Sequence, residues 1–247
     1  MKKFGLVLLA TLAASTFATD SFSSAQKQEI NKLVEQYIAN NPKVVMQSLI
    51  KFREQAIEEQ NTKAKKAVVT NFTKLVKAQH SPVMGNPNGD VTLVEFLDYR
   101  CGHCREMSDV IKTLIKQDKN LKVVIKQLPI FSGDSLTAAK AALAINQQGK
   151  FATLHHELLT QESNLNAKTI DALVTKTTAD LAKVHKTMQQ AWVQQEIDAN
   201  MSLAKQLGLM GTPAFIIVNS TDATSNEVIP GAASLERMTS IIKSIRK

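Results

Sequence analysis

The stretch VTLVEFLDYRCGHCREM, residues 91–107, decides the fold and holds both cysteines of the 247-residue chain, Cys101 and Cys104. Its first seven residues, Val91–Leu97, are apolar on both faces, which is typical of a strand buried in the centre of a sheet. From Cys101 onward the apolar residues recur at helical spacing. The sequence therefore predicts a central strand that leads, through a short turn, into a helix beginning at the first cysteine.

The segments that follow this stretch predict an α/β domain with a helical insertion. LKVVIKQLPI, from Leu121, has the composition of a second strand. Residues from about 135 to 207 are strongly helical, whereas PAFIIV, Pro213–Val218, and the later EVIPG return to strand. SLERMTSIIKSI predicts an amphipathic closing helix. The order of strand, helix, strand, helical block, two strands and helix is that of an α/β core.

The first residues, 1–18, have the pattern of a secretory signal peptide. Two lysines precede an apolar run from Phe4 to Ala14, and Thr16 and Ala18 suit the −3 and −1 positions of a cleavage site. The run is shorter than the roughly 20 apolar residues of a membrane-spanning helix, and an uncleaved anchor is the alternative. The sequence therefore places the mature protein outside the reducing cytosol, where disulfides persist.

The charge balance gives little support to nucleic-acid binding. The formal net charge is +8, and loss of residues 1–18 removes two lysines and no acids, which leaves +6. The lysines are scattered along the chain and aromatic residues make up 5% of it. A nucleic-acid interface needs a clustered basic face, commonly with aromatic side chains. The mild positive charge instead suits a solvated surface, with some attraction to anionic envelope surfaces.

Residues 24–77 predict an all-helical segment that cannot build its own core. Ser23 and Gln26 form a potential capping box, and no glycine occurs between Ser23 and Lys77. Short apolar stripes at helical spacing flank a charged middle, and they consist of Ile30, Leu33, Val34, Tyr37, Ile38, Val45, Met46, Leu49 and Phe52 before it and Val68, Val69, Phe72 and Leu75 after it. Such stripes need a partner surface. We interpret the segment as an oligomerisation stalk of a homodimer or higher homo-oligomer, with folding back onto the main domain as the alternative.

The boundary between the stalk and the main domain is predicted at HSPVMGNPNGD, residues 80–90. This stretch is rich in proline, glycine and asparagine, which mark turns and linkers. We therefore expect the α/β domain to occupy residues 80–247.

The tetrapeptide CGHC admits four interpretations, and reversible thiol–disulfide exchange explains it best. A zinc site needs about four ligands, and the histidines offer no second ligand pair. Covalent haem attachment needs a histidine directly after the second cysteine, but Arg105 stands there. A purely structural disulfide across four residues would contribute roughly 2 kcal/mol, compared with nearly 5 for a 100-residue loop. Exchange chemistry requires only two thiols in one short motif.

The placement of the two cysteines favours exchange. A helix N-terminus stabilises an anion, so we expect Cys101 to be the exposed nucleophilic thiolate. His103 adds positive charge beside it. Cys104 lies one turn further along, turned inward, and can attack a mixed disulfide formed at Cys101. Stabilising the thiolate stabilises the reduced protein, which makes the oxidised protein a stronger oxidant.

The motif VTLVEFLDYRCGHC together with LGLMGTPAFIIV resembles the DsbA-like branch of the thioredoxin superfamily, over about residues 80–247. YIANNPKVVMQSL in the stalk and SPVMGNPNGDVTLVEF after it resemble the oligomeric ScsC-type and Com-type members from Gram-negative bacteria. The resemblance implies a thioredoxin-like fold with a helical insertion and no cofactor or metal beyond the redox-active disulfide Cys101–Cys104. It also implies a periplasmic location, with association with the outer membrane or cell surface as a further option.

The same resemblance implies what the protein acts on. Its partners would be unfolded or misoxidised exported proteins, together with a membrane protein that restores the disulfide. The dipeptide Gly-His between the cysteines is that of protein disulfide isomerase rather than the Pro-His of DsbA. Disulfide formation and disulfide isomerisation therefore both remain open.

Three further residues are carried over from the family. Glu95 alternates with Leu93 and Leu97 and so faces an apolar side, where the superfamily keeps a buried acid. A buried carboxyl has a raised pKa and can take the proton of Cys104 through water; a glutamate at the surface is the alternative. Pro213 matches the cis-proline that faces the active site, with an ordinary trans proline as the alternative. A substrate can pair with the backbone of Thr212 by strand addition.

Two other functions stay open at the level of sequence. Soft thiolates bind Cu(I), so a copper-binding or metal-tolerance protein of the ScsC type can use Cys101 and Cys104 as ligands. A surface antigen with an idle CGHC motif is the other possibility.

Overall fold

The computed structural model describes residues 22–77, 79–161 and 165–246 of the chain. The predicted signal peptide, residues 1–18, lies outside the described residues. The chain divides into two compact units, Met1–Gln55 and Ala56–Lys247. Each unit is described separately below.

The first unit contains helix α1 (Ser24–Asn40) and the beginning of α2 (Pro42–Thr70), which continues into the second unit. The predicted capping box is present, because Ser23 and Gln26 each accept a hydrogen bond from the other's backbone N–H. No residue of α1 is buried. Large apolar side chains of this unit are exposed, namely Ile30, Leu33, Val34, Tyr37, Ile38, Val44, Val45, Met46, Leu49, Ile50 and Phe52. The described part of the first unit therefore has no core of its own.

The second unit is built on a five-stranded sheet with the order β1-β3-β2-β4-β5. The strands are β1 (Val83–Gly85), β2 (Val91–Leu97), β3 (Leu121–Gln127), β4 (Ala214–Asn219) and β5 (Asn226–Ile229). Strands β2 and β3 are parallel, and the other neighbouring pairs are antiparallel. All seven residues of β2 are buried, as the sequence predicted for the central strand. This mixed sheet with helices on both faces is the predicted thioredoxin-like architecture.

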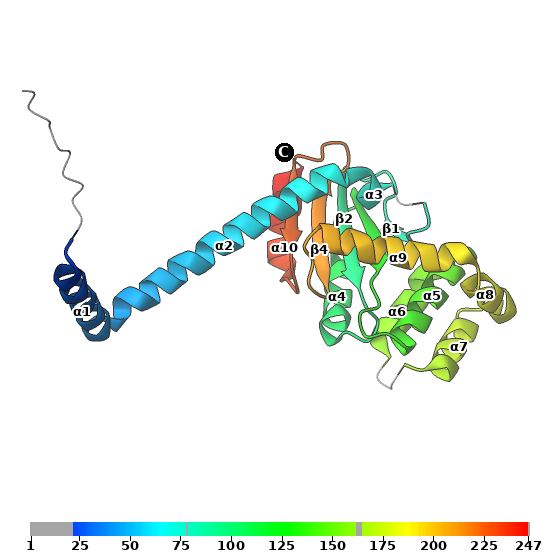
Figure 1. Ribbon diagram of the computed structural model, residues 1–247. Helices are drawn as coiled ribbons and strands as arrows, with labels where there is room; N and C mark the ends of the chain where they lie inside the picture. Colours follow the sequence, from blue (N-terminus) through cyan, green and yellow to red (C-terminus); the bar gives the residue numbers. More distant parts are fainter. Residues whose placement is uncertain (1–21, 78, 162–164, 247) are drawn as a thin grey trace, which may run out of the picture. The chain divides into compact units, whose positions relative to one another are not determined.

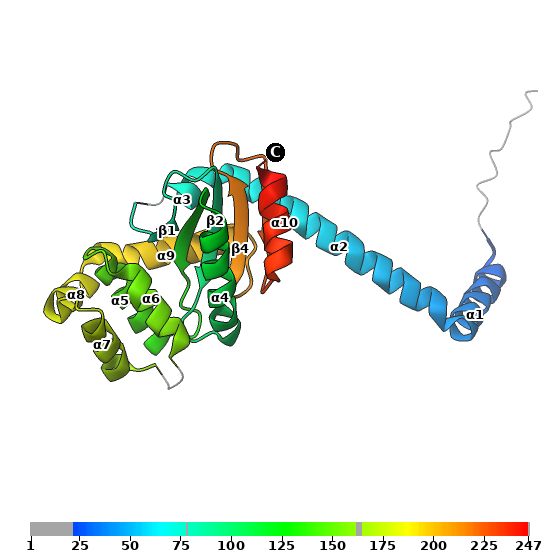
Figure 2. The ribbon, with the colours of Figure 1, turned by 180° about the vertical axis from the view of Figure 1, so that it is seen from behind.

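Helices cover both faces of the sheet (Figures 1 and 2). On one face, residues of β2 such as Leu93 and Leu97 form a core with α4 (Gly102–Gln117), α6 (Phe151–Thr160) and α10 (Leu235–Ile245). On the other face, Val94 and Phe96 pack with α3 (Phe72–Val76), α9 (Ala191–Gln206) and the last turns of α2. Because successive side chains along β2 point to opposite faces, the strand contributes residues to two separate cores.

The predicted helical insertion is confirmed between β3 and β4. It comprises α5 (Asp134–Asn146), α6, α7 (Ala167–Lys176), α8 (Leu181–Met188) and α9. Most of α5 is buried because it contacts the four other helices of the insertion. The small strand β1 was not predicted, because its three residues lie in the turn-rich linker and include Gly85. It is an edge strand that pairs antiparallel with β3.

The boundary of the compact domain differs from the predicted one. The sequence placed it at residue 80, whereas the second unit begins at Ala56. The physical reason is that Ala64 and Val68 of α2 and Leu75 and Val76 of α3 are buried in the core on the α9 face. The second apolar stripe predicted for the stalk therefore belongs to the α/β domain. The first stripe lies exposed, whereas in the second stripe Val69 alone is among the exposed large apolar residues of the described chain.

Two adjacent valines of α2 test this boundary. Val68 is fully buried and Val69 is 44% exposed. We expect Val68→Ala to lower the free energy of unfolding by about 2 kcal/mol, because it removes two methyl groups from a packed core. The matched control Val69→Ala should change it by less than about 0.5 kcal/mol. Urea unfolding of both variants measures the difference, and equal effects would mean that this end of α2 is not part of the domain core.

Candidate active site

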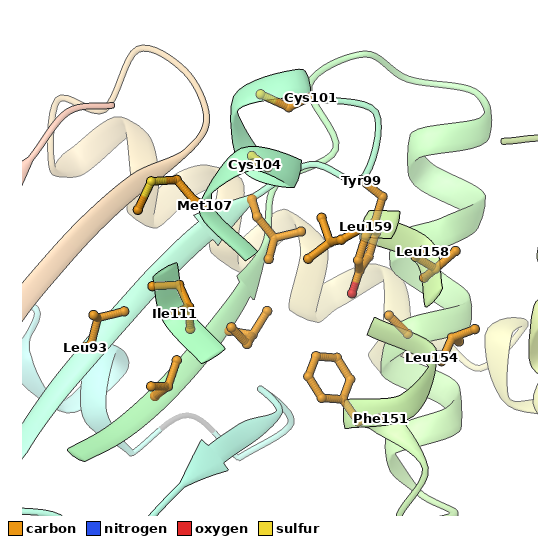
Figure 3. Packing of buried hydrophobic residues seen from close by; sticks show 14 of the residues in the cluster. Leu93, Tyr99, Cys101, Cys104, Met107, Ile111, Phe151, Leu154, Leu158 and Leu159 are labelled. Carbon is orange, nitrogen blue, oxygen red and sulfur yellow. The ribbon is translucent and has the colours of Figure 1, made fainter. Parts of the chain in front are cut away.

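Cys101 lies where the central strand has ended and α4 begins (Figure 3). It is the N-cap residue of α4, with an extended backbone (φ −77°, ψ 120°), and its side chain makes no capping hydrogen bond. Its N–H donates to the carbonyl oxygen of Asp98 at 3.0 Å, and Arg105 donates to its carbonyl oxygen at 3.2 Å. The predicted position at a helix N-terminus is confirmed. The backbone of Cys101 is therefore held, and its thiol is not used as a helix cap.

The two cysteines differ in accessibility less than the sequence suggested. Both are free thiols; Cys101 is 7% exposed and Cys104 is fully buried. Cys101 was expected to be exposed, and it is largely covered because its Sγ–H lies against the carbonyl oxygen of Thr212 at 3.1 Å. Cys104 points inward, as predicted, with Met107 and Ile111 on the buried side of α4 (Figure 3). Cys101 remains the thiol that solvent can reach.

The segment before β4 forms the second wall of the site. The peptide bond between Thr212 and Pro213 is cis, as the family resemblance implied. Pro213 is buried and β4 begins at the next residue, Ala214. The side-chain oxygen of Thr212 is buried and has no hydrogen-bond partner among the described residues. The fold thus brings Thr212 and Pro213 to Cys101, although 111 positions separate Cys101 from Thr212.

Glu95 is the buried acid that the sequence predicted. It lies on β2 and is almost completely enclosed. Burial raises the pKa of its carboxyl to about 8, so it is mostly protonated at neutral pH. It lines a cavity of about 400 Å³ between α4 and α6, together with Ile111, Ala152 and His155. A neutral acid lies behind the cysteine pair.

The thiol of Cys104 is held in its neutral form. Burial raises the pKa of Cys104 well above its usual range, and negative charge on Cys101 and Glu95 raises it further. Removing a proton from either Glu95 or Cys104 therefore makes removal from the other harder. The pair favours a state with at least one proton present.

His103 lies on the exposed side of α4. Its side chain is exposed, and Nδ1 lies 2.9 Å from Oε2 of Glu106, one helical turn along α4. The predicted positive charge beside Cys101 stays a prediction, and Glu106 is the hydrogen-bond partner of the ring. Glu106 was missed by sequence reasoning, although its i,i+3 spacing from His103 was visible.

A buried polar network below the cysteines was also missed. The hydroxyl of Tyr99 lies 3.0 Å from Nδ1 of His155, and Nε2 of Gln127 donates to the same hydroxyl at 3.3 Å. Burial lowers the pKa of His155 to about 3, with the charge of His156 as a second cause, so the ring is neutral. Tyr99 and the neutral ring of His155 therefore share one hydrogen bond, whose donor depends on which ring nitrogen carries the proton. No sequence pattern links these residues, because they are 28 and 56 positions from Tyr99.

The chemistry available at this site is that of two thiols and their protons. Across residues 22–77, 79–161 and 165–246, no group of three or more histidine, cysteine or acidic side chains is arranged to hold a metal ion. The site residues predicted from sequence come together as one cluster around α4 and the start of β4, with His103 at its exposed rim.

Comparison with known proteins supports a single family. The profile of the DSBA-like thioredoxin domain matches residues 92–243. A thioredoxin-like oxidoreductase from Silicibacter pomeroyi DSS-3 is 32% identical, with a TM-score of 0.66 over 70% of this chain and 96% of that chain. BcfH of Salmonella enterica Typhimurium (23% identical, TM-score 0.79) aligns over 90% of this chain and 97% of its own. ScsC of Proteus mirabilis (24% identical, TM-score 0.65) aligns over 92% and 97%.

Curated relatives include an enzyme and two transporters. The thiol:disulfide interchange protein DsbA of Burkholderia cepacia is 26% identical over 163 residues, which are 60% of this chain and 74% of that protein. The Na(+)/H(+) antiporter NhaA 1 of Salinispora arenicola is 25% identical over 137 residues. The match covers 55% of this chain and 21% of the antiporter, so the chain spans about one fifth of the length of that relative.

The difference between the two thiols predicts selective labelling. In the reduced protein at pH 6, iodoacetamide should modify Cys101 at least about tenfold faster than Cys104, because Cys104 is enclosed and its thiolate is disfavoured. Peptide mass mapping after a short pulse measures the ratio. Labelling in denaturant provides the control, since both thiols should then react. Equal labelling of the folded protein would contradict the assignment.

The buried acid predicts an unusual dependence of stability on pH. The folded state keeps the proton of Glu95 up to about pH 8, whereas the unfolded chain releases it near 4.5. The folded state therefore binds more protons between these values, and stability falls as pH rises through this window. Glu95→Gln should remove that loss. From pH 5 to pH 8, the free energy of unfolding of the variant should therefore rise relative to that of the parent by on the order of 3 kcal/mol.

Urea unfolding of the reduced protein at both pH values tests this expectation. The control is Glu58→Gln, which removes the same charge from an exposed position of α2. A constant difference between Glu95→Gln and the parent at pH 5 and pH 8 would show that Glu95 titrates normally.

Proposed function

The chain belongs to the family of DSBA-like thioredoxin domains, and from this membership we propose that it is an exported thiol–disulfide oxidoreductase that introduces disulfide bonds into envelope and secreted proteins. The likeness to ScsC extends the family resemblance over nine-tenths of the chain. Activity as a thiol–disulfide oxidoreductase follows from the family. Export, isomerisation and the identity of the clients are parts of the proposal.

One observation carries the proposal. Cys101 begins a helix and presents its sulfur to the backbone of Thr212, and Cys104 stands directly behind it. A client cysteine that reaches Cys101 also reaches the exposed end of the segment before β4. Main-chain pairing with Thr212 would hold an extended client there. The redox-active disulfide Cys101–Cys104 is the only redox group that the proposed reaction needs.

The proposed reaction proceeds by two exchanges. A client thiolate attacks Sγ of Cys101 in the oxidised enzyme; the client–Cys101 bond forms, and the Cys101–Cys104 bond breaks. A second client thiolate then attacks the client sulfur of this mixed disulfide and releases Cys101 as a thiolate. Two electrons pass from the client dithiol to the enzyme disulfide. The products are a client disulfide and the reduced enzyme.

In the proposed reaction, Glu95 would donate a proton to the leaving thiolate of Cys104 and take it back on reoxidation. When the disulfide opens, charge appears on Cys104, whose thiolate is disfavoured by burial. The protonated carboxyl of Glu95 can supply a proton to it, directly or through water in the adjoining cavity. Reoxidation uses the same path in reverse. Because the pKa of Glu95 is about 8, either direction is accessible near neutral pH.

Exposed apolar side chains near the cysteines support binding of unfolded clients. Met210, two residues before Thr212, is 93% exposed. Ile130 and Phe131 are exposed in the loop after β3, and the N–H of Phe131 donates to Asp98, which also holds Cys101. Apolar surface beside a reactive thiol suits polypeptides that have not yet buried their own apolar residues.

Export and reoxidation complete the proposed cycle. Relatives with DsbA-like domains are periplasmic. Among the described helices, none has the length and apolar character required to cross a bilayer. We infer that the reduced enzyme gives its electrons to a separate redox partner in the membrane. Association with the outer membrane or cell surface is a further part of the proposal.

We also propose that the first unit joins two or more copies of the chain. Its apolar stripes are exposed and α1 buries nothing. An exposed apolar surface of this extent is typical of an interaction site, and a second copy offers the same stripes. Several active sites held in one assembly would raise the effective concentration of thiols around a bound client.

Isomerisation is the second candidate function, favoured by the Gly-His dipeptide between the cysteines. An isomerase attacks a wrong disulfide with the Cys101 thiolate and stays bound while the client rearranges. The proposed assembly would favour this behaviour, because a released client thiol would find a second active site nearby. Copper capture and an idle surface antigen are the competing functions.

Oxidation of reduced ribonuclease tests the main proposal. The oxidised mature protein should generate active ribonuclease and accumulate Cys101 and Cys104 as thiols. Cys101→Ser should reduce the rate to that without enzyme, because the bond to the client cannot form. Cys104→Ser in turn should trap reduced Cys101 in a mixed disulfide with oxidised client. A mature protein that neither oxidises ribonuclease nor exchanges electrons with it would leave the antigen or copper function in its place.

Removal of the first unit tests the proposed assembly. A chain that begins at Ala56 should be a folded monomer, whereas the mature chain should be at least a dimer by light scattering. The monomer should oxidise reduced ribonuclease at about the parent rate, because the site lies within the second unit. It should reactivate scrambled ribonuclease more slowly than the mature chain at equal active-site concentration.

Each half of this prediction can fail separately. A monomeric mature chain would remove the assembly. A monomer that isomerises as well as the mature chain would leave isomerisation in place and remove its dependence on the first unit.

A further inference from the structure

Asp98 is a buried acid that the exchange reaction does not use. It lies one residue after β2 and three before Cys101. Its Oδ1 accepts hydrogen bonds from the N–H of Arg100 at 2.8 Å and the hydroxyl of Ser135 at 2.7 Å. Its Oδ2 accepts the N–H of Phe131 at 3.1 Å. Its carbonyl oxygen accepts the N–H of Cys101. One residue thus collects donors from three segments of the chain.

The three segments carry different parts of the site. Arg100 belongs to the turn that bears Cys101, Ser135 lies in the first turn of α5, and Phe131 lies in the loop after β3. In this loop Ser132 has φ +53°, which costs energy for a residue other than glycine. A loop held in such a conformation needs contacts that fix it. The hydrogen bond from Phe131 to Asp98 is one that ties it directly to the cysteine turn.

We propose that Asp98 is a positioning residue for client binding, because it locks the apolar loop of Ile130 and Phe131 against the turn that carries Cys101. An unfolded client would then place an apolar side chain on the loop while its cysteine reaches Sγ of Cys101. This role rests on the proposed function for the identity of the client. It adds a determinant of affinity that acts through the loop and leaves the chemistry of the thiols unchanged.

The carboxylate is required because every neighbour of its two oxygens is a donor. Asparagine has nearly the same shape, and its single side-chain oxygen can keep the bonds from Arg100 and Ser135. Its NH₂ group would then face the N–H of Phe131, so two donors would meet without an acceptor. Asp98→Asn therefore releases the loop selectively. The matched control Ser135→Ala removes one bond to Oδ1 and leaves the bond from Phe131.

Binding without chemistry gives the direct test. The probe is a fluorescein-labelled unstructured peptide with leucine and phenylalanine beside an S-methylated cysteine, and its anisotropy is followed with the full mature protein. We expect Asp98→Asn to weaken binding about tenfold, the equivalent of one hydrogen bond to a charged group. Phe131→Ala keeps its N–H but loses the apolar side chain offered to the peptide, and should weaken binding by about the same factor. Ser135→Ala should weaken it less than twofold. The double variant Asp98→Asn/Phe131→Ala should bind no more weakly than either single variant, since both act through one loop.

Kinetics separate positioning from chemistry. With reduced ribonuclease as client, Asp98→Asn should raise KM about tenfold and leave kcat within about twofold of the parent. Oxidation of dithiothreitol, which is too small to reach the loop, should be unchanged. An equal loss of oxidation rate with ribonuclease and with dithiothreitol would mean that Asp98 supports only the cysteine turn, and it would overturn the proposal. So would unchanged peptide affinity in Asp98→Asn.

Hydrogen exchange supplies a readout that needs no variant, should Asp98→Asn fail to fold. In the parent, the amide of Phe131 should exchange slowly and gain protection when the peptide binds. Fast exchange that the peptide does not alter would overturn the proposal. The oxidation assay and the binding assay also fail independently. If the parent binds the peptide with this pattern but oxidises nothing, the role of the loop stands and the proposed enzyme activity is wrong. If the parent oxidises ribonuclease without binding the peptide, the enzyme activity stands and the role of the loop is wrong.

Discussion

Complete burial of strand β2 is the constraint on which the rest of the domain depends. The strand is covered on both faces and has hydrogen-bonded neighbours on both edges, β3 and β4. Its odd and even residues therefore need two different helical layers. Helices α4, α6 and α10 supply one, and α3, α9 and the last turns of α2 supply the other. The chain must leave the strand at its carboxyl end, which is where α4 begins and where α/β sheets commonly bind ligands.

The site is a consequence of that exit. Cys101 occupies the first position outside α4, so its thiol lies at a helix N-terminus while its backbone is held by Asp98. The antiparallel neighbour β4 starts at the same end of the sheet, which brings Thr212 within hydrogen-bond distance of the sulfur. The face of β2 that carries Leu93 and Leu97 also carries Glu95, which places this acid behind the cysteines. Its carboxyl is neutral for the same reason that the leucines beside it are buried.

Helix α2 shows how one element can serve two purposes. Its last turns bury Ala64 and Val68 and are part of the domain core, whereas its first turns expose apolar side chains. Apolar spacing alone cannot separate these cases, because both halves have stripes at helical intervals. What distinguishes them is whether a sheet face lies opposite. No residue of α1 is buried, which is why we propose that the first unit joins copies of the chain.

The sequence by itself determined the strand before CGHC, the helix after it, the helical insertion and the placement of both cysteines in one short motif. These features are local, because periodicity, capping and the identity of Cys101 and Cys104 depend on residues within a few positions. Family resemblance added Glu95, Thr212 and Pro213. Sequence could not show that α2 and α3 complete the domain core, that Glu106 engages His103, or that Asp98, Tyr99, Gln127 and His155 surround the site with hydrogen bonds. Most of these contacts join residues tens of positions apart, and only the packing of the sheet and its helices decides which polar side chains meet once water is excluded.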